Sequence, residues 1–427
     1  MGMGLYTLGI YLFSFVMRIA ALFHPKARAW VEGRRGWRRK QKSASNAPAP
    51  LLWIHCASLG EFEQGRPVIE GLKAQLPQLR VLLTFFSPSG YEVRKDYAQA
   101  DHVHYLPLDT PANAKAFLDI WQPDIAVFVK YEFWYNHLQA LQRRQIPVLL
   151  IAGLFRPGQL FFRPYGKPFR RVLRGFGHLF VQNEASARLL SAYGLEQHTT
   201  AGDTRIDRVW QIARAAPQNT VVEAFAQQHP VLVIGSSWPE DERHLLPFLN
   251  EYLPADWKAI LAPHQIGESH LRDIEAGLQL PCLRYSAAAS SEAEEKARVM
   301  IIDNIGMLSG LYQYGRIAYI GGAFGSGLHN TLEPIAFGLP VLFGPKYDKF
   351  EEARYLVEAG GGFVVRDSAA VRQQFQQLLM PDVYRQAAQA ARQYIERNRG
   401  ASQVAVAAIM ERISPESTTG VGHGRMR

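Results

Sequence analysis

The sequence is poor in cysteine: its 427 residues include only Cys56 and Cys282, which lie far apart. Two distant cysteines exclude a disulfide framework and a zinc site built on closely spaced cysteines. So few cysteines are typical of a protein from a reducing compartment. The glycine-rich region near residue 321 also lacks a pair of acids with Asp-x-Asp spacing. We therefore expect no metal site of that kind there.

The length and the charge of the chain exclude fewer classes of protein than its cysteine content does. A chain of 427 residues is long enough for two or three domains with ample core. Its charged content of 20% and hydrophobic content of 48% are ordinary for a globular protein. The net charge of +9 predicts a negatively charged partner, and nucleic acid, a membrane surface and an anionic substrate all qualify. The placement of the basic residues has to decide between these classes.

Residues 5–23 are almost wholly apolar and contain a single charge, Arg18. A run of this length can just span a bilayer, although Arg18 makes spanning more costly. No small-residue cleavage site follows, which argues against a cleaved signal peptide. We expect residues 1–24 to be an N-terminal membrane anchor of the signal-anchor type, which either spans the membrane or lies in its surface. A buried core helix is the alternative.

A basic stretch follows the apolar run. Basic residues directly after an anchor mark the cytoplasmic side and bind anionic lipid. Residues 25–50 are therefore predicted to be a basic interfacial linker at the cytoplasmic face of the inner (cytoplasmic) membrane, with Trp30 and Trp37 suited to the interface. The basic residues are Lys26, Arg28, Arg34, Arg35, Arg38, Arg39, Lys40 and Lys42.

The remainder alternates short apolar runs with helix-length segments, which is typical of βα units around parallel sheets. We expect strands at 51–56, 81–86, 125–129, 148–152 and 178–181, then at 231–234, 259–262, 299–302, 317–320, 341–343 and 363–365. The pattern predicts one α/β domain over residues 51–208 and a second over 209–396. A charged hinge loop over 201–208, a C-terminal helix over 397–413 and a disordered tail over 414–427 complete the prediction.

Acidic residues follow two strands of the first domain, at the edge where parallel sheets carry their sites. Glu61 ends the loop after the first strand, near the start of a helix, and Glu132 follows the strand that ends near residue 129. Each is either a carboxylate aimed into a cleft or a cap that complements a helix terminus. Residues 153–176 interleave arginines with aromatic residues, which favours an anionic lipid head over nucleic acid or a solvated helix face.

The strongest motif is the segment over residues 321–338, with four glycines within seven residues after the strand at 317–320. Glycines allow a tight turn and a close backbone approach to a ligand. A short helix over 331–337 is expected next, with Thr331 as its N-cap and Glu333 in its first turn. Together with His329 and Asn330, this arrangement predicts a nucleotide site rather than a plain turn. One nucleotide loop in two α/β halves matches the two-domain glycosyltransferase architecture (GT-B).

The chain resembles the 3-deoxy-D-manno-octulosonic acid (Kdo) transferases of lipopolysaccharide and lipid A biosynthesis, from the N-terminal anchor to about residue 400. The resemblance is carried by the anchor with Gly33-Arg34-Arg35-Gly36, the H-x-A-S-x-G-E loop ending at Glu61, and E-x-W at 132–134. It also covers residues 202–207, Gly-Ser-Ser-Trp at 235–238 and the block G-G-x-F to H-N-x-L-E-P at 321–334. It implies two Rossmann-like domains facing across a cleft, a CMP-Kdo donor in the second domain and a lipid A precursor (lipid IVA) as acceptor in the first.

The resemblance also implies roles for individual residues. Glu61 is implied as the catalytic base, and Glu132 and Arg205 as stabilisers of the transition state. Two positions depart from the family, which commonly has Arg where this chain has His264 and Lys where it has Arg205. The positions implied to contact CMP are Pro263, His264, Ile305, Gly306, Met307, Asn330, Thr331, Leu332 and Glu333.

The sequence therefore predicts inverting glycosyl transfer without a metal or other cofactor, with no nucleic acid as partner. Two alternatives use a similar fold: another membrane-associated sugar-nucleotide glycosyltransferase, and a sugar-nucleotide epimerase. A non-catalytic membrane-tethered module is the third. The anchor argues against an epimerase, and the acid at the first strand end argues against a tethered module.

Overall fold

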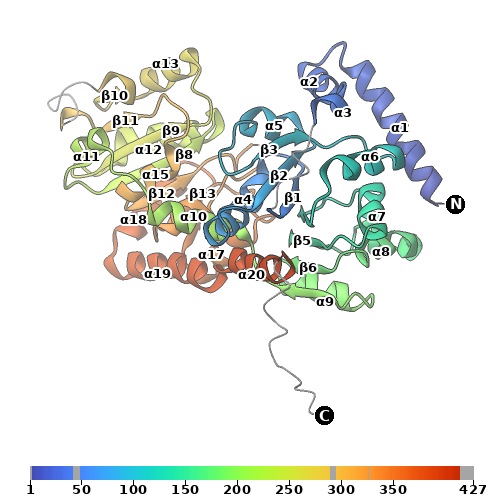
Figure 1. Ribbon diagram of the computed structural model, residues 1–427. Helices are drawn as coiled ribbons and strands as arrows, with labels where there is room; N and C mark the ends of the chain where they lie inside the picture. Colours follow the sequence, from blue (N-terminus) through green and yellow to red (C-terminus); the bar gives the residue numbers. More distant parts are fainter. Residues whose placement is uncertain (1, 42–48, 289–294, 326, 414–427) are drawn as a thin grey trace. The chain divides into compact units, whose positions relative to one another are not determined.

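The computed structural model describes residues 2–41, 49–288, 295–325 and 327–413. The chain forms two compact units, residues 1–208 with 400–427 and residues 209–399 (Figure 1). Each unit is built on its own seven-stranded, all-parallel sheet. The two parallel α/β domains predicted from the alternation of apolar runs and helices are thus confirmed.

The sheet of the first unit has the order β3-β2-β1-β4-β5-β6-β7. Its strands are β1 (Leu51–Cys56), β2 (Arg80–Phe85), β3 (His102–Tyr105), β4 (Ile125–Val129), β5 (Val148–Gly153), β6 (His178–Val181) and β7 (His198–Thr200). The central strand β1 is fully buried, and its side chains alternate between two cores. Leu52 and Ile54 pack with helices α4 (Leu59–Gln75) and α20 (Ala401–Ile413) on one face. Trp53 packs on the other face against α6 (Pro111–Trp121) and α7 (Tyr135–Arg143).

Shorter helices complete this unit: α5 (Pro88–Arg94), α8 (Lys167–Leu173), α9 (Glu184–Ser191), and the 3-10 turns η1 (Leu160–Phe162) and η2 (Pro164–Gly166). The C-terminal helix α20 belongs to it through Asp207. Its carboxylate accepts hydrogen bonds from the backbone N–H of Gly400 and Ser402, at 2.5 and 2.6 Å, and from the Ser402 hydroxyl at 2.6 Å. Helix α20 therefore belongs to the first unit, although it follows the second unit in the sequence.

The sheet of the second unit has the order β10-β11-β9-β8-β12-β13-β14. Its strands are β8 (Val231–Ser237), β9 (Lys258–Pro263), β10 (Cys282–Arg284), β11 (Val299–Ile301), β12 (Ile317–Ile320), β13 (Val341–Phe343) and β14 (Gly362–Val364). Its helices and turns are α11 (Thr220–Ala226), α12 (Pro239–Tyr252), α13 (Glu268–Gly277), η3 (Tyr285–Ala287), α15 (Leu308–Leu311), η4 (Tyr312–Tyr314), α16 (Leu332–Ala336), α17 (Glu351–Ala359), α18 (Ser368–Leu379) and α19 (Pro381–Asn398). Buried residues of α12, α13 and α18 form one core with the sheet.

Most predicted strands are confirmed within a residue or two, whereas β3, β7 and β10 were not predicted. The predicted hinge loop is wrong from Thr204 onward, because helix α10 (Thr204–Arg214) begins there and contains Arg205 and Asp207. The predicted tail over 414–427 lies outside the described residues. The predicted helices on either side of Gly400 are confirmed, with a φ of +109° at that glycine.

The N-terminal segment forms three helices, α1 (Gly2–Ala20), α2 (Pro25–Arg34) and α3 (Trp37–Lys40). The residues expected to be an interfacial linker thus include two helices. Trp30 and Trp37 do not suit an interface, because their side chains are only 4% and 9% exposed and pack inside the first unit. Among the residues that the structure describes, no helix combines the length and apolarity needed to cross a membrane.

Aromatic packing also explains the arginine-rich stretch over residues 153–176. Phe155, Phe162 and Phe176 are buried in the core of the first unit that also contains Trp53, and Phe161 packs against that core. Only Tyr165 among the aromatic residues of this stretch is largely exposed. The interleaved pattern therefore reflects core packing of short helices, and it does not support the predicted site for a lipid head.

Candidate active site

Glu61 lies in the first turn of α4, directly beyond the carboxyl end of β1. Ser58 caps this helix, with its hydroxyl oxygen accepting the backbone N–H of Gly60 at 3.3 Å. The same hydroxyl donates a short hydrogen bond to Oε2 of Glu61. The Glu61 side chain is half-buried and is held through one oxygen, so the other oxygen remains available to a substrate hydroxyl.

Glu132 follows β4, the strand paired with β1, and its carboxylate is 12% exposed. Two nitrogens approach its Oε2: His55 Nε2 at 3.1 Å and Trp134 Nε1 at 2.6 Å. The other ring nitrogen of His55 lies 2.9 Å from the hydroxyl of Thr84, which itself accepts a hydrogen bond from Trp53 Nε1 at 2.8 Å. Glu132 is therefore the end of a hydrogen-bonded chain that starts inside the core.

Arg205 is paired closely with Asp203. Its Nε and Nη2 donate to Oδ2 of that aspartate at 2.8 and 2.6 Å. Burial alone would raise the pKa of Asp203, but the charge and hydrogen bonds of Arg205, helped by Gln64, hold it below its ordinary value. The guanidinium is thus fixed in place at the start of α10, with part of its charge balanced.

Lys130 is a cation at this edge that the sequence analysis did not single out. It follows the last residue of β4 with a φ of +67°, a conformation that is uncommon outside glycine. Burial and then the charge of Arg205 lower the pKa of Lys130, while Glu61 and Asp203 act in the opposite direction. The only available signal was its place two residues before Glu132, at the end of a buried strand.

In the second unit, the glycine turn after β12 is fixed to the start of α12 by Asp241. This buried carboxylate accepts hydrogen bonds from the backbone N–H of Gly322 and of Trp238, at 2.8 and 2.9 Å, and from the hydroxyl of Tyr319. Gly322 has a φ of +93°. A Cβ on Gly321 would lie 2.2 Å from a backbone oxygen of Ser236, so both glycines are required by the turn.

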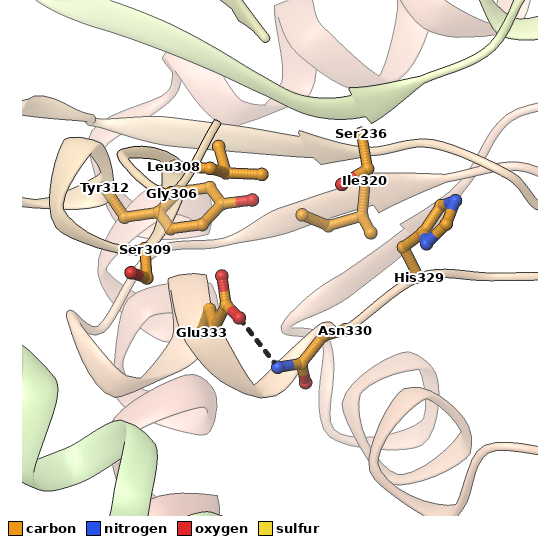
Figure 2. Close-up of a pocket in the computed structure, with 9 residues that line it drawn as sticks. All are labelled: Ser236, Gly306, Leu308, Ser309, Tyr312, Ile320, His329, Asn330 and Glu333. Atoms are coloured by element: carbon orange, nitrogen blue, oxygen red, sulfur yellow. Dashed lines mark hydrogen bonds between the residues drawn. The ribbon is translucent and has the colours of Figure 1, made fainter. Parts of the chain in front are cut away.

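A cavity of about 240 Å³ opens beside this turn (Figure 2). Three of the nucleotide-contacting residues predicted from the sequence line it: Gly306, Asn330 and Glu333. Asn330 donates from Nδ2 to Oε1 of Glu333 at 3.0 Å, the bond drawn in Figure 2, and this bond directs both side chains along the same wall. The remaining lining residues are Ser236, Leu308, Ser309, Tyr312, Ile320 and His329.

The predicted capping role of Thr331 is wrong. Thr331 has helical dihedral angles, and its buried hydroxyl makes no hydrogen bond within the described residues. Asn330 takes this role instead, since its Oδ1 accepts the backbone N–H of Leu332 at 3.2 Å. Helix α16 spans only five residues, so its own terminus contributes little to anion binding.

Comparison with known proteins shows which family this chain is similar to. Residues 30–208 match the family model described as 3-Deoxy-D-manno-octulosonic-acid transferase (kdotransferase). A 3-deoxy-D-manno-octulosonic acid transferase from Aquifex aeolicus (strain VF5) is 26% identical over 333 residues, which cover 77% of this chain and 86% of that protein. This chain is a homologue of the Kdo transferases. The resemblance inferred from the motifs is therefore confirmed.

Solved structures share the fold of this Kdo transferase homologue. The UDP-GlcNAc 2-epimerase from Neisseria meningitidis, bound to UDP-GlcNAc, has a TM-score of 0.59 at 17% identity and covers 85% of this chain and all of its own. The calicheamicin glycosyltransferase CalG4 has a TM-score of 0.54 at 12% identity, with 87% and 100% coverage. At these identities the likeness shows the fold alone, which glycosyltransferases and epimerases share.

Several positions implied by the Kdo transferase resemblance do not line the cavity. Leu332 and Thr331 are buried, while Ile305 is 87% exposed. Pro263 and Met307 also lie outside the lining. His264 instead stacks against both Trp238 and His329, with centroids 4.4 and 4.6 Å away, and these two rings are joined by a 2.8 Å hydrogen bond from Trp238 Nε1 to His329 Nε2. The roles predicted for all of these residues stay predictions.

Proposed function

We propose that this protein transfers Kdo from CMP-Kdo to a lipid A precursor, lipid IVA, with inversion at the anomeric carbon and without a metal ion. The coarser part, a Kdo-transferring glycosyltransferase, is supported by homologues of that name that match most of the chain. The observation that carries the proposal is the carboxylate pair at the carboxyl ends of the adjacent strands β1 and β4.

The donor is proposed to bind in the second unit. Glu333 and Asn330, joined by their hydrogen bond, offer a carboxylate and an amide to the ribose and base of a nucleotide. The glycine turn held by Asp241 brings backbone close to the same cavity. His264 and His329 stack beside it and would meet the phosphate of CMP. This assignment explains why glycines, histidines and one acid are concentrated around a single turn.

Glu61 is proposed as the general base in the first unit. A sugar hydroxyl is too weak an acid to attack unaided, so its proton must leave as the new bond forms. The hydroxyl oxygen attacks the anomeric carbon of Kdo, its proton passes to Glu61, and the bond to the phosphate oxygen of CMP breaks with its electron pair. A single displacement of this kind inverts the configuration. The Ser58 hydroxyl on one oxygen of Glu61 orients the other.

Glu132, Arg205 and Lys130 are proposed to balance the charges that develop during transfer. The sugar gains positive charge in an oxocarbenium-like transition state, which a fixed carboxylate such as Glu132 stabilises. The leaving CMP gains negative charge, which a cation offsets. Arg205 is already paired with Asp203, so Lys130 adds a cation for which the described residues show no ion pair with a carboxylate.

The epimerase alternative has support from the fold, because the Neisseria meningitidis structure is a UDP-GlcNAc 2-epimerase. The sequence relatives favour transfer, since the matching family model and the relatives compared above are named as Kdo transferases. A different membrane-associated glycosyltransferase would need a different donor sugar in the same cavity. Substrate turnover separates these possibilities.

We further propose that α1 lies in the cytoplasmic surface of the inner membrane. Tyr6 and Phe13 hold the helix to the first unit, through a 2.6 Å hydrogen bond to Asp109 and contacts with Trp30 and Phe86. Its other side exposes apolar residues, namely Leu5, Leu8, Tyr11, Leu12, Phe15, Val16 and Ile19. An apolar helix face that is followed by a basic segment is typical of a helix that binds in a membrane interface. A position in the surface also suits an enzyme whose acceptor is a lipid.

The direct experiment is to incubate the full-length protein with CMP-Kdo and lipid IVA, with and without a chelator, and to read the product masses. We expect one or more Kdo residues to be added in both samples, with release of CMP. Epimerisation of UDP-GlcNAc with no Kdo addition would overturn the assignment. Activity that is lost on chelation and restored by added metal would overturn the metal-free mechanism.

A further inference from the structure

A basic cavity of about 430 Å³ lies between α1, α2 and the segment that leads into α6, all within the first unit. Three arginines line it, Arg18 from α1 and Arg34 and Arg35 from the end of α2, together with the polar residues Ser14 and Asn113. None of its described lining residues is an aspartate or a glutamate. We call this cavity the arginine groove. Its charge is therefore not balanced by the residues that form it.

Arg34 supplies positive charge, and all three of its guanidinium nitrogens already donate to backbone oxygens. Its side chain is 8% exposed and donates to the backbone oxygens of Leu106, Trp30 and Phe86 at 2.9, 3.1 and 2.7 Å. Burial lowers the pKa of Arg34 to about 9, which still leaves the guanidinium charged at neutral pH. A buried cation whose neighbours are carbonyls rather than carboxylates creates a positive potential in the adjoining space.

Arg18 and Arg35 are the two arginines that a ligand can reach. Both are exposed, and neither guanidinium makes a hydrogen bond or an ion pair with the residues that the structure describes. Two unpaired guanidiniums beside a fixed charge are suited to a phosphate, because arginine presents paired donors that match its oxygens. The shared chemistry is thus a phosphate anion.

The surroundings of the arginine groove indicate which phosphate. A second cavity of about 300 Å³ shares Ser14, Arg18 and Asn113 with the groove and adds Tyr11 and Phe15. These two aromatic residues belong to the exposed apolar side of α1. A ligand with its phosphate at the arginines could therefore lay an acyl chain along α1, which a free phosphate or a nucleic acid cannot do.

We propose that the arginine groove binds the phosphate headgroup of an anionic membrane lipid, with the lipid tail along the exposed side of α1. The proposal rests on the membrane association of α1 proposed above and is independent of the transfer chemistry. It explains why Arg18 is present, because a charge in an apolar helix is energetically costly unless it has an anionic partner. It also assigns specific lipid recognition to Arg18 and Arg35 among the many basic residues of the segment.

The test compares two double variants of the full-length protein that lose the same charge. Arg18→Gln/Arg35→Gln alters the groove, whereas Lys26→Gln/Arg39→Gln removes two exposed charges of the same segment that do not line it. Binding is measured by flotation with phosphatidylcholine vesicles, with and without phosphatidylglycerol. We expect both variants to lose the general surface term of roughly 1 kcal/mol for each cation, about 30-fold, and the groove variant to lose at least about tenfold more because charge-assisted hydrogen bonds to the phosphate are removed. The control should lose clearly less.

Equal losses in the two variants would overturn the proposal, because a diffuse surface charge would then explain binding. Failure of the parent protein to bind any vesicle would overturn the membrane association of α1 together with it. Heat released by inorganic phosphate with the parent protein but not the groove variant, without any difference on vesicles, would assign the groove to free phosphate instead. A preserved difference on vesicles in a protein that shows no Kdo transfer would retain this proposal while the transferase assignment failed.

Discussion

The Nε2 atom of His55 lies 3.1 Å from Oε2 of Glu132. The indole N–H of Trp134 lies 2.6 Å from the same carboxylate oxygen and 3.0 Å from Nε2 of His55, so one donor joins the two groups. On the other side of the ring, Nδ1 lies 3.1 Å from the backbone oxygen of Thr84 and 2.9 Å from its hydroxyl, whose oxygen accepts a hydrogen bond from Trp53. His55 is therefore a positioning residue for Glu132, and a fully buried one.

The first prediction follows from this geometry. His55→Phe keeps a ring in the core but removes the ring nitrogen 3.1 Å from the Glu132 carboxylate, so turnover should fall about 10- to 100-fold, the cost of a hydrogen bond to a charged group. The affinity for CMP should not change, because His55 belongs to the other unit. His55→Gln, whose amide can donate, should restore part of the rate. If both variants lose CMP binding or unfold, the role of His55 is structural only.

Glu333 tests the donor site. Glu333→Ala should weaken CMP binding by about 1–3 kcal/mol, since a charge-assisted hydrogen bond to the nucleotide is lost. Calorimetric titration with CMP measures the effect, and Glu358→Ala, an exchange in α17 outside the cavity, is the control. Unchanged affinity in Glu333→Ala would show that this carboxylate serves only its hydrogen bond with Asn330.

His104 predicts a pH dependence of stability. Burial, and then the neighbouring His102, lower its pKa from 6.5 to about 4. Between these values the unfolded chain binds a proton that the folded chain does not, so stability rises with pH across this window and falls as pH drops from 6.5 toward 4. Urea denaturation at several pH values should show a smaller acid loss in His104→Phe, which retains the ring beside Trp121. An identical pH profile would contradict the assignment.

Arg34 is predicted to stabilise the first unit. Arg34→Met leaves three backbone oxygens without their donor, each worth on the order of 1 kcal/mol or more when buried. The urea concentration at the midpoint of unfolding should therefore be clearly lower for Arg34→Met than for the parent protein. Arg35→Gln, at the next position but exposed, should stay within about 0.5 kcal/mol of the parent. Equal urea midpoints for the two variants would contradict a stabilising role for the hydrogen bonds of Arg34.

How far the sequence could be interpreted depended on burial. The central strand β1 was predicted with correct ends because all six of its residues are buried and apolar or paired, which leaves a clear run. Strand β3 (His102–Tyr105) was missed because it lies at the sheet edge, where three of its four residues are only partly buried and need not be apolar. Periodicity therefore identified the interior strands and missed three of the four edge strands of the described sheets, with β14 as the exception.

The site shows a similar limit. Glu61 and Glu132 were found because acids that follow strand ends are conspicuous. Lys130 was not, because its significance depends on a backbone conformation and a buried setting that no sequence pattern shows. Trp30 was placed at a membrane interface because tryptophan beside basic residues is typical of one, yet it packs against Phe13, Phe86 and Arg34. Tertiary contacts decided its position.

The central claim, that Glu61 is the general base, is tested most directly by the turnover of Glu61→Gln. The amide is nearly isosteric but cannot accept the proton of the acceptor hydroxyl, and the loss of a general base typically costs about 10²–10⁴ in rate. We predict a fall of that size in turnover with CMP affinity unchanged. Near-full turnover in Glu61→Gln, with activity abolished in Ser58→Ala or His55→Ala, would contradict the assignment.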